Sequence, residues 1–348
     1  MTIDAARARI LLVGNPDPVH VGAHFMSAAH TLGIAVRLCD SRDAFAAPAW
    51  RRKLNWWLRG HRPSALRSFS ERVVHAARAD RVSAVLTTGI APLDVDAVRM
   101  LGRLGVKRLN FLTDDPWNPE HRAPWFLHAL HHYDHVFTPR RGNMADLRSL
   151  GGPAVSYLPF AYAPETHHPA ASLTAGDRER FRADLVFVGG ADPDRVRVVT
   201  PFIEAGFDVA LYGGYWDRYA STRAHARGFL NADDLRKAIG GGAVSLCLVR
   251  RANRDGHSMR SFEVAAMAGC MLVEDTDEHR QIFGAGENAV TYFRTSRDGI
   301  VSLRALVDNA TRRAAMSARV RELVCHGEHT YAARLREMTA ICVAADVA

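Results

Sequence analysis

The sequence is most constrained by residues 260–274, which read Arg-Ser-Phe-Glu-Val-Ala-Ala-Met-Ala-Gly-Cys-Met-Leu-Val-Glu. Small and apolar residues recur at helical spacing before Gly269, and a short apolar run follows it, so we expect a helix that leads into a buried strand. We expect Gly269 to close the helix in the left-handed conformation, which glycine adopts without strain. Helices that lead into buried strands are typical of open parallel sheets, which bind ligands at the carboxyl ends of their strands.

Arg260 and Glu263 lie three positions apart, so a helix places their side chains on one face. An ordinary surface ion pair is the structural alternative. The run from Asp255 to Glu263, an acid followed by seven residues and a glutamate, resembles the paired-acid motif of GT-B glycosyltransferases, although Asp255 stands where the motif has glutamate. The longer run to residue 274, with His-Thr-Tyr at residues 329–331, is similar to the C-terminal module of the CgeB-like (spore-maturation-type) glycosyltransferases.

This resemblance has direct implications for two carboxylates. In the broader family the helix glutamate holds the ribose hydroxyls of the donor, which assigns that role to Glu263. The first acid touches the donor sugar, which assigns that role to Asp255. The paired-acid motif also favours retention of the anomeric configuration.

The length of 348 residues favours two domains over one large core. We expect an N-terminal acceptor-side domain at 1–165, a nucleotide-sugar domain at 166–330, and a helix at 331–348 that packs back on the first domain. The net charge of +8 favours an anionic partner, which includes a phosphate-bearing small molecule, an anionic membrane or a nucleic acid.

The five cysteines are scattered and form no Cys-x-x-Cys pair, so neither a zinc ribbon nor a disulfide framework is indicated. Free thiols fit the reducing cytoplasm. Residues 1–9 lack the apolar core of a signal peptide, and no apolar run reaches transmembrane length. We therefore expect a cytoplasmic protein, with peripheral contact to the inner membrane face as an open possibility.

The first half opens with a strand at residues 10–15, a helix from Val21 and another strand, but without the Gly-x-Gly-x-x-Gly dinucleotide fingerprint. In GT-B proteins the loop after the first strand borders the site between the domains, which makes His20 a candidate; a solvated loop histidine is the alternative. Asp114 and Asp115 follow a strand at 107–112 and precede a Pro-Trp turn. They are candidates for a base, a sugar-hydroxyl ligand or a metal ligand, and a side-chain cap of the turn is the alternative. The resembled family has a similar run of acids before proline here, which implies a role on the acceptor side.

Tryptophans and cations alternate around Trp50, Trp56 and Trp57. A basic helix that carries tryptophan is typical of proteins that lie in an anionic lipid interface. The alternative is a helix whose tryptophans pack on the first domain while its cations face water. Nucleic-acid binding is the weakest interpretation, because no such motif accompanies the segment, and we expect no nucleic-acid partner.

The second half restarts with a strand that ends in Gly189 and Gly190, where backbone N–H groups and a helix N-terminus can approach a phosphate. The next strand ends at Gly213, and the resembled family uses the later turn at Phe229 and Leu230 as an apolar wall for the nucleotide base. Several arginines follow or adjoin the central strand, and one of them is expected to neutralise a diphosphate, with solvated side chains as the alternative for the others: Arg250, Arg251, Arg254 and Arg260.

These observations predict an α/β protein of GT-B fold, with two doubly wound Rossmann-like domains that face a cleft. The predicted function is sugar transfer from a nucleotide-sugar to a glycan, a lipid-linked acceptor or a protein. We expect a hexosyltransferase-type enzyme without metal or other cofactor. Two alternatives stay open: a sugar-nucleotide epimerase or hydrolase of the same fold, and a non-catalytic nucleotide-sugar-binding module.

Overall fold

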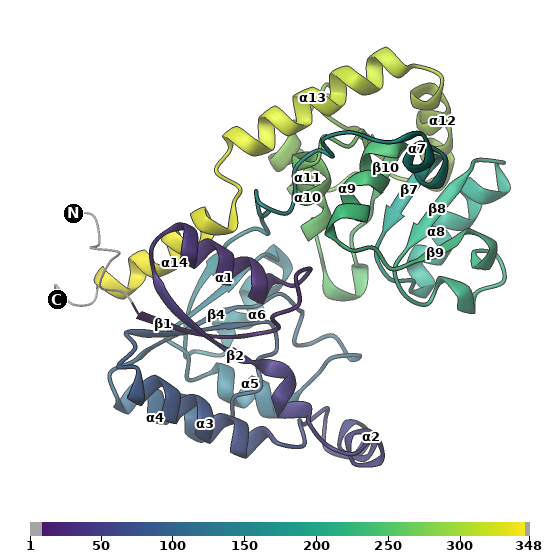
Figure 1. Cartoon of the computed structure of the whole chain (residues 1–348). Helices are drawn as coiled ribbons and strands as arrows, with labels where there is room; N and C mark the ends of the chain where they lie inside the picture. Colours follow the sequence, from purple (N-terminus) through teal and green to yellow (C-terminus); the bar gives the residue numbers. More distant parts are fainter. Residues whose placement is uncertain (1–8, 345–348) are drawn as a thin grey trace. The chain divides into compact units, whose positions relative to one another are not determined.

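The computed structural model describes residues 9–344, with the side chains of Trp56 and of residues 342–344 outside the described part. The chain forms two compact units (Figure 1). The first contains residues 9–159, 252–254 and 331–344, and the second contains residues 160–251 and 255–330. Each unit is built around a parallel sheet of six strands.

The sheet of the first unit has the order β2-β1-β3-β4-β5-β6, so the direction of winding reverses between β1 and β3. Its strands are β1 (Arg9–Gly14), β2 (Ala35–Asp40), β3 (Ala84–Thr88), β4 (Lys107–Phe111), β5 (His135–Thr138) and β6 (Ala154–Tyr157). Its helices are α1 (Val21–Thr31), α2 (Ala49–Leu58), α3 (Leu66–Ala79), α4 (Val95–Arg103), α5 (Pro124–Leu130), α6 (Met144–Ser149) and α14 (Tyr331–Ala344).

Strand β1 lies between β2 and β3, and its register places Ile10 opposite Ala84. Its continuous apolar run, residues 10–13, is buried because both faces of a parallel sheet are covered. The last helix of the chain, α14, belongs to this unit: the ring of Tyr331 stacks on His24 at 5.0 Å and meets Phe25 edge-on at 5.2 Å. The C-terminal helix α14 therefore contributes to the core of the unit that also contains the first strand of the chain.

The sheet of the second unit has the order β12-β11-β10-β7-β8-β9, the doubly wound order in which winding reverses between β7 and β10. Its strands are β7 (Ala183–Val188), β8 (Val209–Tyr212), β9 (Ala226–Gly228), β10 (Gly242–Cys247), β11 (Met271–Glu274) and β12 (Thr291–Phe293). Its helices are α7 (Ala175–Phe181), α8 (Pro193–Glu204), α9 (Ala232–Gly241), α10 (Met259–Ala266), α11 (Asp277–Phe283), α12 (Ser296–Val307) and α13 (Ala310–His326).

Most helices of the second unit begin at a polar side chain that accepts a backbone N–H of the first turn. Asp192 caps α8, Asn231 caps α9 and Thr276 caps α11. Such a cap satisfies one of the four N–H groups that a helix leaves without a partner, and it contributes about 1 kcal/mol. The helix boundaries are therefore encoded locally.

The prediction for Gly269 is wrong. The left-handed residue after α10 is Ala268, with a φ of 59°. Glycine is required one position later for a different reason: a Cβ atom on Gly269 would lie 2.6 Å from Cγ1 of Val264 and 2.9 Å from Cγ2 of Ile239. Close packing between α10 and α9, and not backbone conformation, thus selects this glycine.

Within residues 9–344, no helix combines the length and the apolar character that crossing a membrane requires.

Candidate functional site

The switch point of the second unit lies between the carboxyl ends of β7 and β10, where open α/β sheets bind ligands. Gly189 and Gly190 follow β7, and they form a tight contact with the loop after β8. A Cβ atom on Gly213 would lie 2.5 Å from the carbonyl oxygen of Gly189, and Gly213 has a φ of 124°. Only glycine therefore fits position 213.

We call Gly189, Gly190, Gly213 and Gly214 the glycine platform, and hydrogen bonds make it rigid. The N–H of Gly189 donates to the carbonyl of Tyr212 (2.8 Å), and the N–H of Ala191 donates to the carbonyl of Gly214 (2.9 Å). The indole of Trp216, which is fully buried, donates to the carbonyl of Gly189 (2.8 Å). The N–H of Gly189 is thus already used within the fold. A ligand can therefore come close to the rigid backbone of the platform. The N–H of Gly189, however, is not available to it as a hydrogen-bond donor.

The carboxylate of Asp192 occupies the N-terminus of α8, because Oδ1 accepts the N–H of Arg195 at 2.9 Å. The predicted phosphate contact at this helix N-terminus therefore has a competitor within the chain. What the helix supplies instead is a cation, the side chain of Arg195 in its first turn.

Arg195 is a functional candidate that the sequence analysis missed. Its guanidinium donates to the carbonyl of Gly190 (2.9 Å) and lies 5.5 Å from the ring centre of Phe187. Its Nε makes no hydrogen bond within the described residues. Burial, followed by repulsion from Arg250, lowers the pKa of Arg195, and Asp192 opposes the shift. A cation in the first turn works against the helix dipole, and this was the signal available in the sequence.

Arg250 adds a second cation from the neighbouring strand end. Its Nε lies 3.6 Å from Asp192 Oδ2, the same carboxylate oxygen that lies 3.6 Å from Nε of Arg195. Two guanidinium groups therefore share one carboxylate at the switch point. Asp255 is placed beside them, because its side chain accepts the backbone N–H of Arg250 at 3.2 Å.

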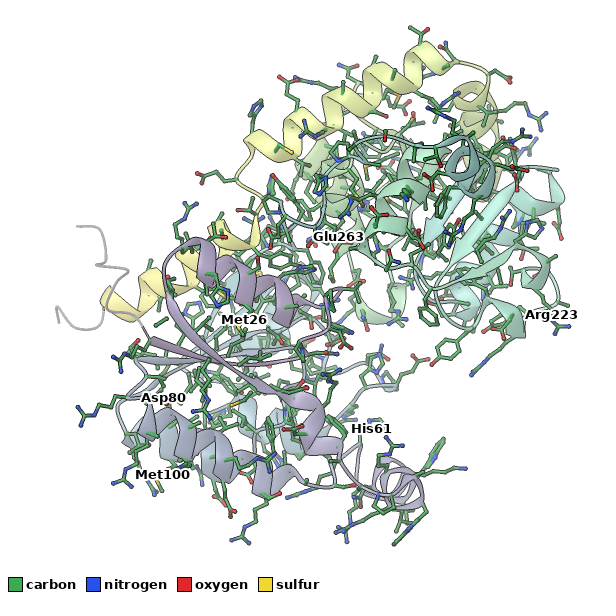
Figure 2. The ribbon with its side chains drawn as sticks, in the orientation of Figure 1. Met26, His61, Asp80, Met100, Arg223 and Glu263 are labelled. Carbon is green, nitrogen blue, oxygen red and sulfur yellow. The ribbon has the colours of Figure 1, made fainter. Side chains whose placement is uncertain are left out.

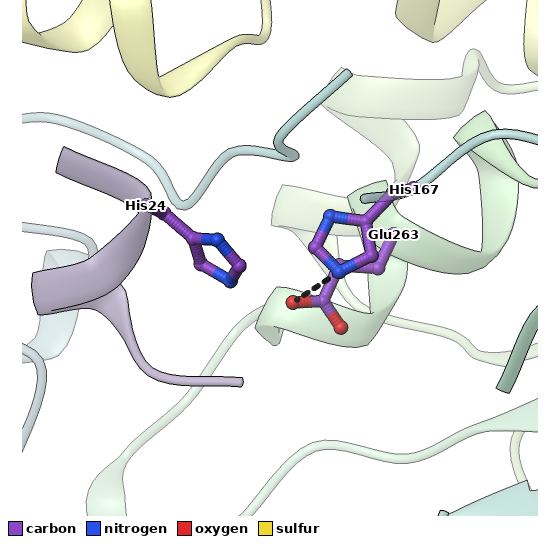
Figure 3. Close-up of side chains that lie close together, drawn as sticks. All are labelled: His24, His167 and Glu263. Atoms are coloured by element: carbon purple, nitrogen blue, oxygen red, sulfur yellow. Dashed lines mark ion pairs between the residues drawn. The ribbon is translucent and has the colours of Figure 1, made fainter. Parts of the chain in front are cut away.

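Helix α10 brings Arg260 and Glu263 together as the spacing predicted, and the two side chains form an ion pair. The side chain of Glu263 is only 1 % exposed, so it does not face bulk water. Its other oxygen lies 3.6 Å from Nε2 of His167, and Figure 3 shows this pair. Burial lowers the pKa of His167, and the negative charge of Glu263 opposes that shift.

A buried polar network anchors the N-terminal part of α10. The hydroxyl of Ser261 accepts the N–H of Ser258 (3.1 Å) and lies 2.8 Å from Nε2 of His279. The Nδ1 of His279 lies 2.8 Å from the carbonyl oxygen of Glu274, so this nitrogen carries the proton. Burial lowers the pKa of His279 to about 4, and the ring is neutral near pH 7.

A second histidine fixes the loop before α10. The N–H of Phe160 donates to Nε2 of His257 (3.2 Å), so Nδ1 carries the proton, and it lies 2.6 Å from a carboxylate oxygen of Glu278. His257 is fully buried. The motif around Arg260 and Glu263 is therefore supported on both sides by residues of α11.

Phe229 lies over the glycine platform, because a Cβ atom on Gly214 would meet its Cζ at 3.3 Å. Its ring is otherwise exposed, and Leu230 beside it is half-buried. The two side chains are thus placed at the edge of the platform, consistent with an apolar wall.

The first unit contains the candidates of the acceptor side. Asp114 follows β4 and lies beside the end of the neighbouring strand β3, since a Cβ atom on Gly89 after β3 would come within 2.9 Å of its Oδ2. Asp115 is buried and accepts the N–H of Trp117 (3.0 Å), so it makes the side-chain turn named as the alternative. His20 is an exposed residue at the start of α1.

The arginines after β10, one of which was predicted to bind the diphosphate, have different partners. Arg254 belongs to the first unit, where its guanidinium contacts Asp115 at 2.6 Å and 3.0 Å and Asp146 at 2.5 Å. Arg251 pairs with Glu274 at 2.7 Å. Arg250 and Arg260 remain at the switch point of the second unit, and Arg195 joins them there.

Comparisons with known proteins agree with the architecture of two parallel sheets. Residues 195–340 match the model of a family described as glycosyl transferase-like. The chain is similar to the structure of sucrose-phosphate synthase from Thermosynechococcus elongatus, with a TM-score of 0.68, 12% identity, and coverage of 97% of this chain and 100% of the other. It is also similar to HepE of Anabaena in complex with UDP and glucose, with a TM-score of 0.62, 9% identity, and coverage of 97% and 100%.

A third structure is a putative UDP-N-acetylglucosamine 2-epimerase from Listeria monocytogenes, with a TM-score of 0.53, 13% identity, and coverage of 94% of each chain. A search of curated proteins finds no significant sequence match. The structural similarities span nearly the whole chain and show the GT-B fold, which confirms the predicted fold class.

Proposed function

We propose that the protein is a glycosyltransferase that moves a sugar from a nucleotide-sugar donor to an acceptor. The observation that carries this proposal is the convergence of Arg195, Arg250 and the Arg260–Glu263 pair on one sheet edge of the second unit. The match to the glycosyl transferase-like family covers the same residues.

The guanidinium groups account for the diphosphate. Arg195 and Arg250 repel each other across a single shared carboxylate, and two phosphate groups between them would relieve that repulsion. Negative charge develops on the nucleoside diphosphate as it leaves. Cations that are already oriented stabilise this charge and so lower the barrier to transfer. They supply the charge that a metal ion supplies in metal-dependent transferases, so we propose a metal-independent reaction.

Glu263 accounts for the ribose. A carboxylate that is held by a neighbouring arginine accepts hydrogen bonds from a vicinal diol in a fixed direction. Gly213 and the wall of Phe229 and Leu230 then line the base, and Asp255 lies beside Arg250 to contact the donor sugar. The paired acids favour a retaining hexosyltransferase of the CgeB-like type.

We propose that the acceptor binds at the carboxyl ends of β3 and β4 in the first unit. Between the two predicted acids, the contacts favour Asp114 as the residue that binds the acceptor hydroxyl, because Asp115 is buried and already pairs with Arg254. The Asp114 carboxylate accepts a hydrogen bond from the hydroxyl of its neighbour Thr113 (3.0 Å). His20, which is exposed at the start of α1 in the same unit, remains a second candidate on this side.

We also propose a cytoplasmic location at the inner face of the membrane. Free thiols at Cys39, Cys247, Cys270 and Cys325 support a reducing compartment. The basic and aromatic segment at residues 50–62 supports contact with the membrane. The acceptor classes therefore include a lipid-linked sugar as well as a glycan or a protein.

The experiment that tests donor binding compares two ligands on one variant. Glu263→Gln should weaken binding of a nucleoside diphosphate about 10- to 100-fold, because a charged hydrogen bond contributes about 1.5–3 kcal/mol. Inorganic pyrophosphate, which has no ribose, should bind wild type and variant alike. Calorimetry with pyrophosphate and with the diphosphates of uridine, guanosine, thymidine and adenosine measures both. Equal nucleotide affinity in the two proteins would remove Glu263 from the site.

The sugar-nucleotide epimerase or hydrolase remains the second candidate, because the Listeria structure named as a putative epimerase shares the fold over 94% of each chain. Turnover of a nucleotide-sugar without any acceptor would favour it over transfer. Nucleotide binding without turnover across a panel of donors and acceptors would instead support a non-catalytic binding module.

A further inference from the structure

Helix α2 of the first unit presents a stripe of apolar side chains to solvent. The exposed fractions are 69% for Trp50, 47% for Leu54, 73% for Trp57 and 75% for Leu58. Their spacing of four, three and one residues places them on one face of a helix. The alternative in which the tryptophans pack on the first domain is therefore wrong for Trp50 and Trp57; the side chain of Trp56 lies outside the described part.

Helix α2 is attached to its unit through a different face, so the apolar stripe faces solvent. Asn55, on a different face of the helix, is buried, and its Nδ2 donates to Oγ of Ser64 at 2.9 Å. The ribbon shows α2 projecting from the edge of its unit (Figure 1), and Figure 2 shows side chains standing out around it, with His61 labelled in the loop that follows. A monomer that exposes two tryptophans and two leucines on one projecting helix has an apolar surface that calls for a partner.

The positively charged residues beside the apolar stripe indicate what kind of partner covers it. Arg51, Arg52, Lys53 and Arg59 are all exposed, and no acidic residue occurs between Asp43 and Glu71. A hollow of about 480 Å³ at the base of the helix is lined by Arg52, Lys53 and Arg62 together with Phe45 and Ser64. Apolar side chains flanked by cations, with a basic hollow at their base, are complementary to a surface of acyl chains and phosphates.

We propose that α2 and this hollow form a docking surface for a membrane of anionic phospholipid. The apolar stripe enters the interface at headgroup depth, and the cations contact lipid phosphates, one of which fits the hollow. A second copy of the chain is a poor occupant, because a two-fold contact through the stripe would bring the same cations together. The inference rests on the proposed function only in bringing a membrane-borne acceptor to the first unit; the surface itself does not depend on it.

The test is co-sedimentation of the full-length protein with vesicles of phosphatidylcholine, alone or with added phosphatidylglycerol. Wild type should bind the anionic vesicles more strongly, and the binding should weaken with salt. The variant Trp57→Ser/Leu58→Ser should lose at least about tenfold in partition. The variant Arg51→Gln/Lys53→Gln should lose about 30-fold on anionic vesicles only.

The matched controls are an exposed apolar residue and an exposed cation on the second unit. Val301→Ser, on α12, and Arg178→Gln should sediment like wild type. Wild type that stays in the supernatant with anionic vesicles would overturn the proposal. A dimer in solution that the Trp57/Leu58 variant abolishes, or binding of a short RNA without vesicle binding, would overturn it in favour of those partners.

Nucleotide binding is measured on the same samples by thermal shift. Vesicle binding without any response to nucleotides would contradict the proposed function and leave the docking surface intact. A nucleotide response without vesicle binding would do the reverse.

Discussion

The two units carry opposite charges at the carboxyl ends of their parallel strands. In the first unit, Asp114 follows β4 and lies beside Gly89 at the end of β3, with Asp115 one residue farther along the chain. In the second unit, the switch point between β7 and β10 carries Arg195 and Arg250. Parallel strand ends meet at one edge in both units, and the residues that follow the strands give the two edges opposite charges. These charges are the reason why we propose a diphosphate ligand for the second unit and a hydroxyl-bearing acceptor for the first.

The two positions also differ in how they are stabilised. The second unit uses backbone contacts within one segment of chain, in which Gly213 and Trp216 hold the loop of Gly189. The first unit uses side chains that are far apart in sequence, because Asp115 is bound by Arg254.

The largest effect is expected where the platform of the second unit is tightest. Gly213→Ala should cost about 4 kcal/mol or more in the free energy of unfolding, because it adds a steric clash to a strained φ. Gly206→Ala is the matched control: its φ of 86° is also left-handed, but its Cβ would meet nothing within 4 Å. It should cost only about 1 kcal/mol. Equal losses in denaturant titrations would show that the close approach is not what matters.

The next effect is a pH dependence of the second unit. The pKa of His279 is lowered from 6.5 to about 4, so the buried ring contributes stability that is present above pH 6.5 and is lost as the pH falls toward 4. The loss should reach about 3 kcal/mol in the unfolding free energy. His279→Gln should remove most of this dependence. His135→Gln in the first unit should remove less, since that ring is less completely buried; a larger effect there would reverse the comparison.

A third prediction concerns the cation that distinguishes the second unit. Arg195→Ala should weaken nucleoside diphosphate binding about 30-fold, or about 2 kcal/mol, because a pre-oriented charged contact is lost. Arg197→Ala, two residues later and 77% exposed, should bind like wild type. Calorimetry on both variants measures the difference, and an equal response would indicate that only net charge matters.

The smallest effect is expected in the first unit. Asp115→Asn should lower the unfolding free energy by about 1–2 kcal/mol, since Arg254 is partly exposed and solvent screens the pair. Asp146→Asn, which removes the exposed partner of the same arginine, should cost less than about 0.5 kcal/mol. Asp114→Asn should leave stability unchanged and lower turnover. A loss of turnover with Asp115→Asn at unchanged stability would restore Asp115 as the reacting acid.

Much of the fold could be predicted from the sequence, because strands and helices are encoded within short windows. The buried run of β1 and the spacing of Arg260 and Glu263 on α10 are examples, and both were found. The prediction from local sequence was wrong at Gly269, where close packing against side chains of α10 and α9, and not a left-handed helix end, requires glycine.

The candidate site was only partly visible in the sequence. Arg195 was not among the predicted site residues, and its contact with Gly190 depends on how the loop after β7 turns back. Arg254 follows β10 in the sequence, but its partners Asp115 and Asp146 lie more than 100 residues earlier, so no spacing could assign it.

The sequence by itself determined the alternation of strands and helices, the acid and arginine on one helix face, and the basic, tryptophan-rich segment. Only the tertiary structure decided which arginines share a carboxylate, which aspartate is held in an ion pair, and that Trp50 and Trp57 face solvent. The physical reason is range: helical and strand periodicity depends on neighbours along the chain, whereas charge pairing and burial depend on which strand ends and helices the topology brings together.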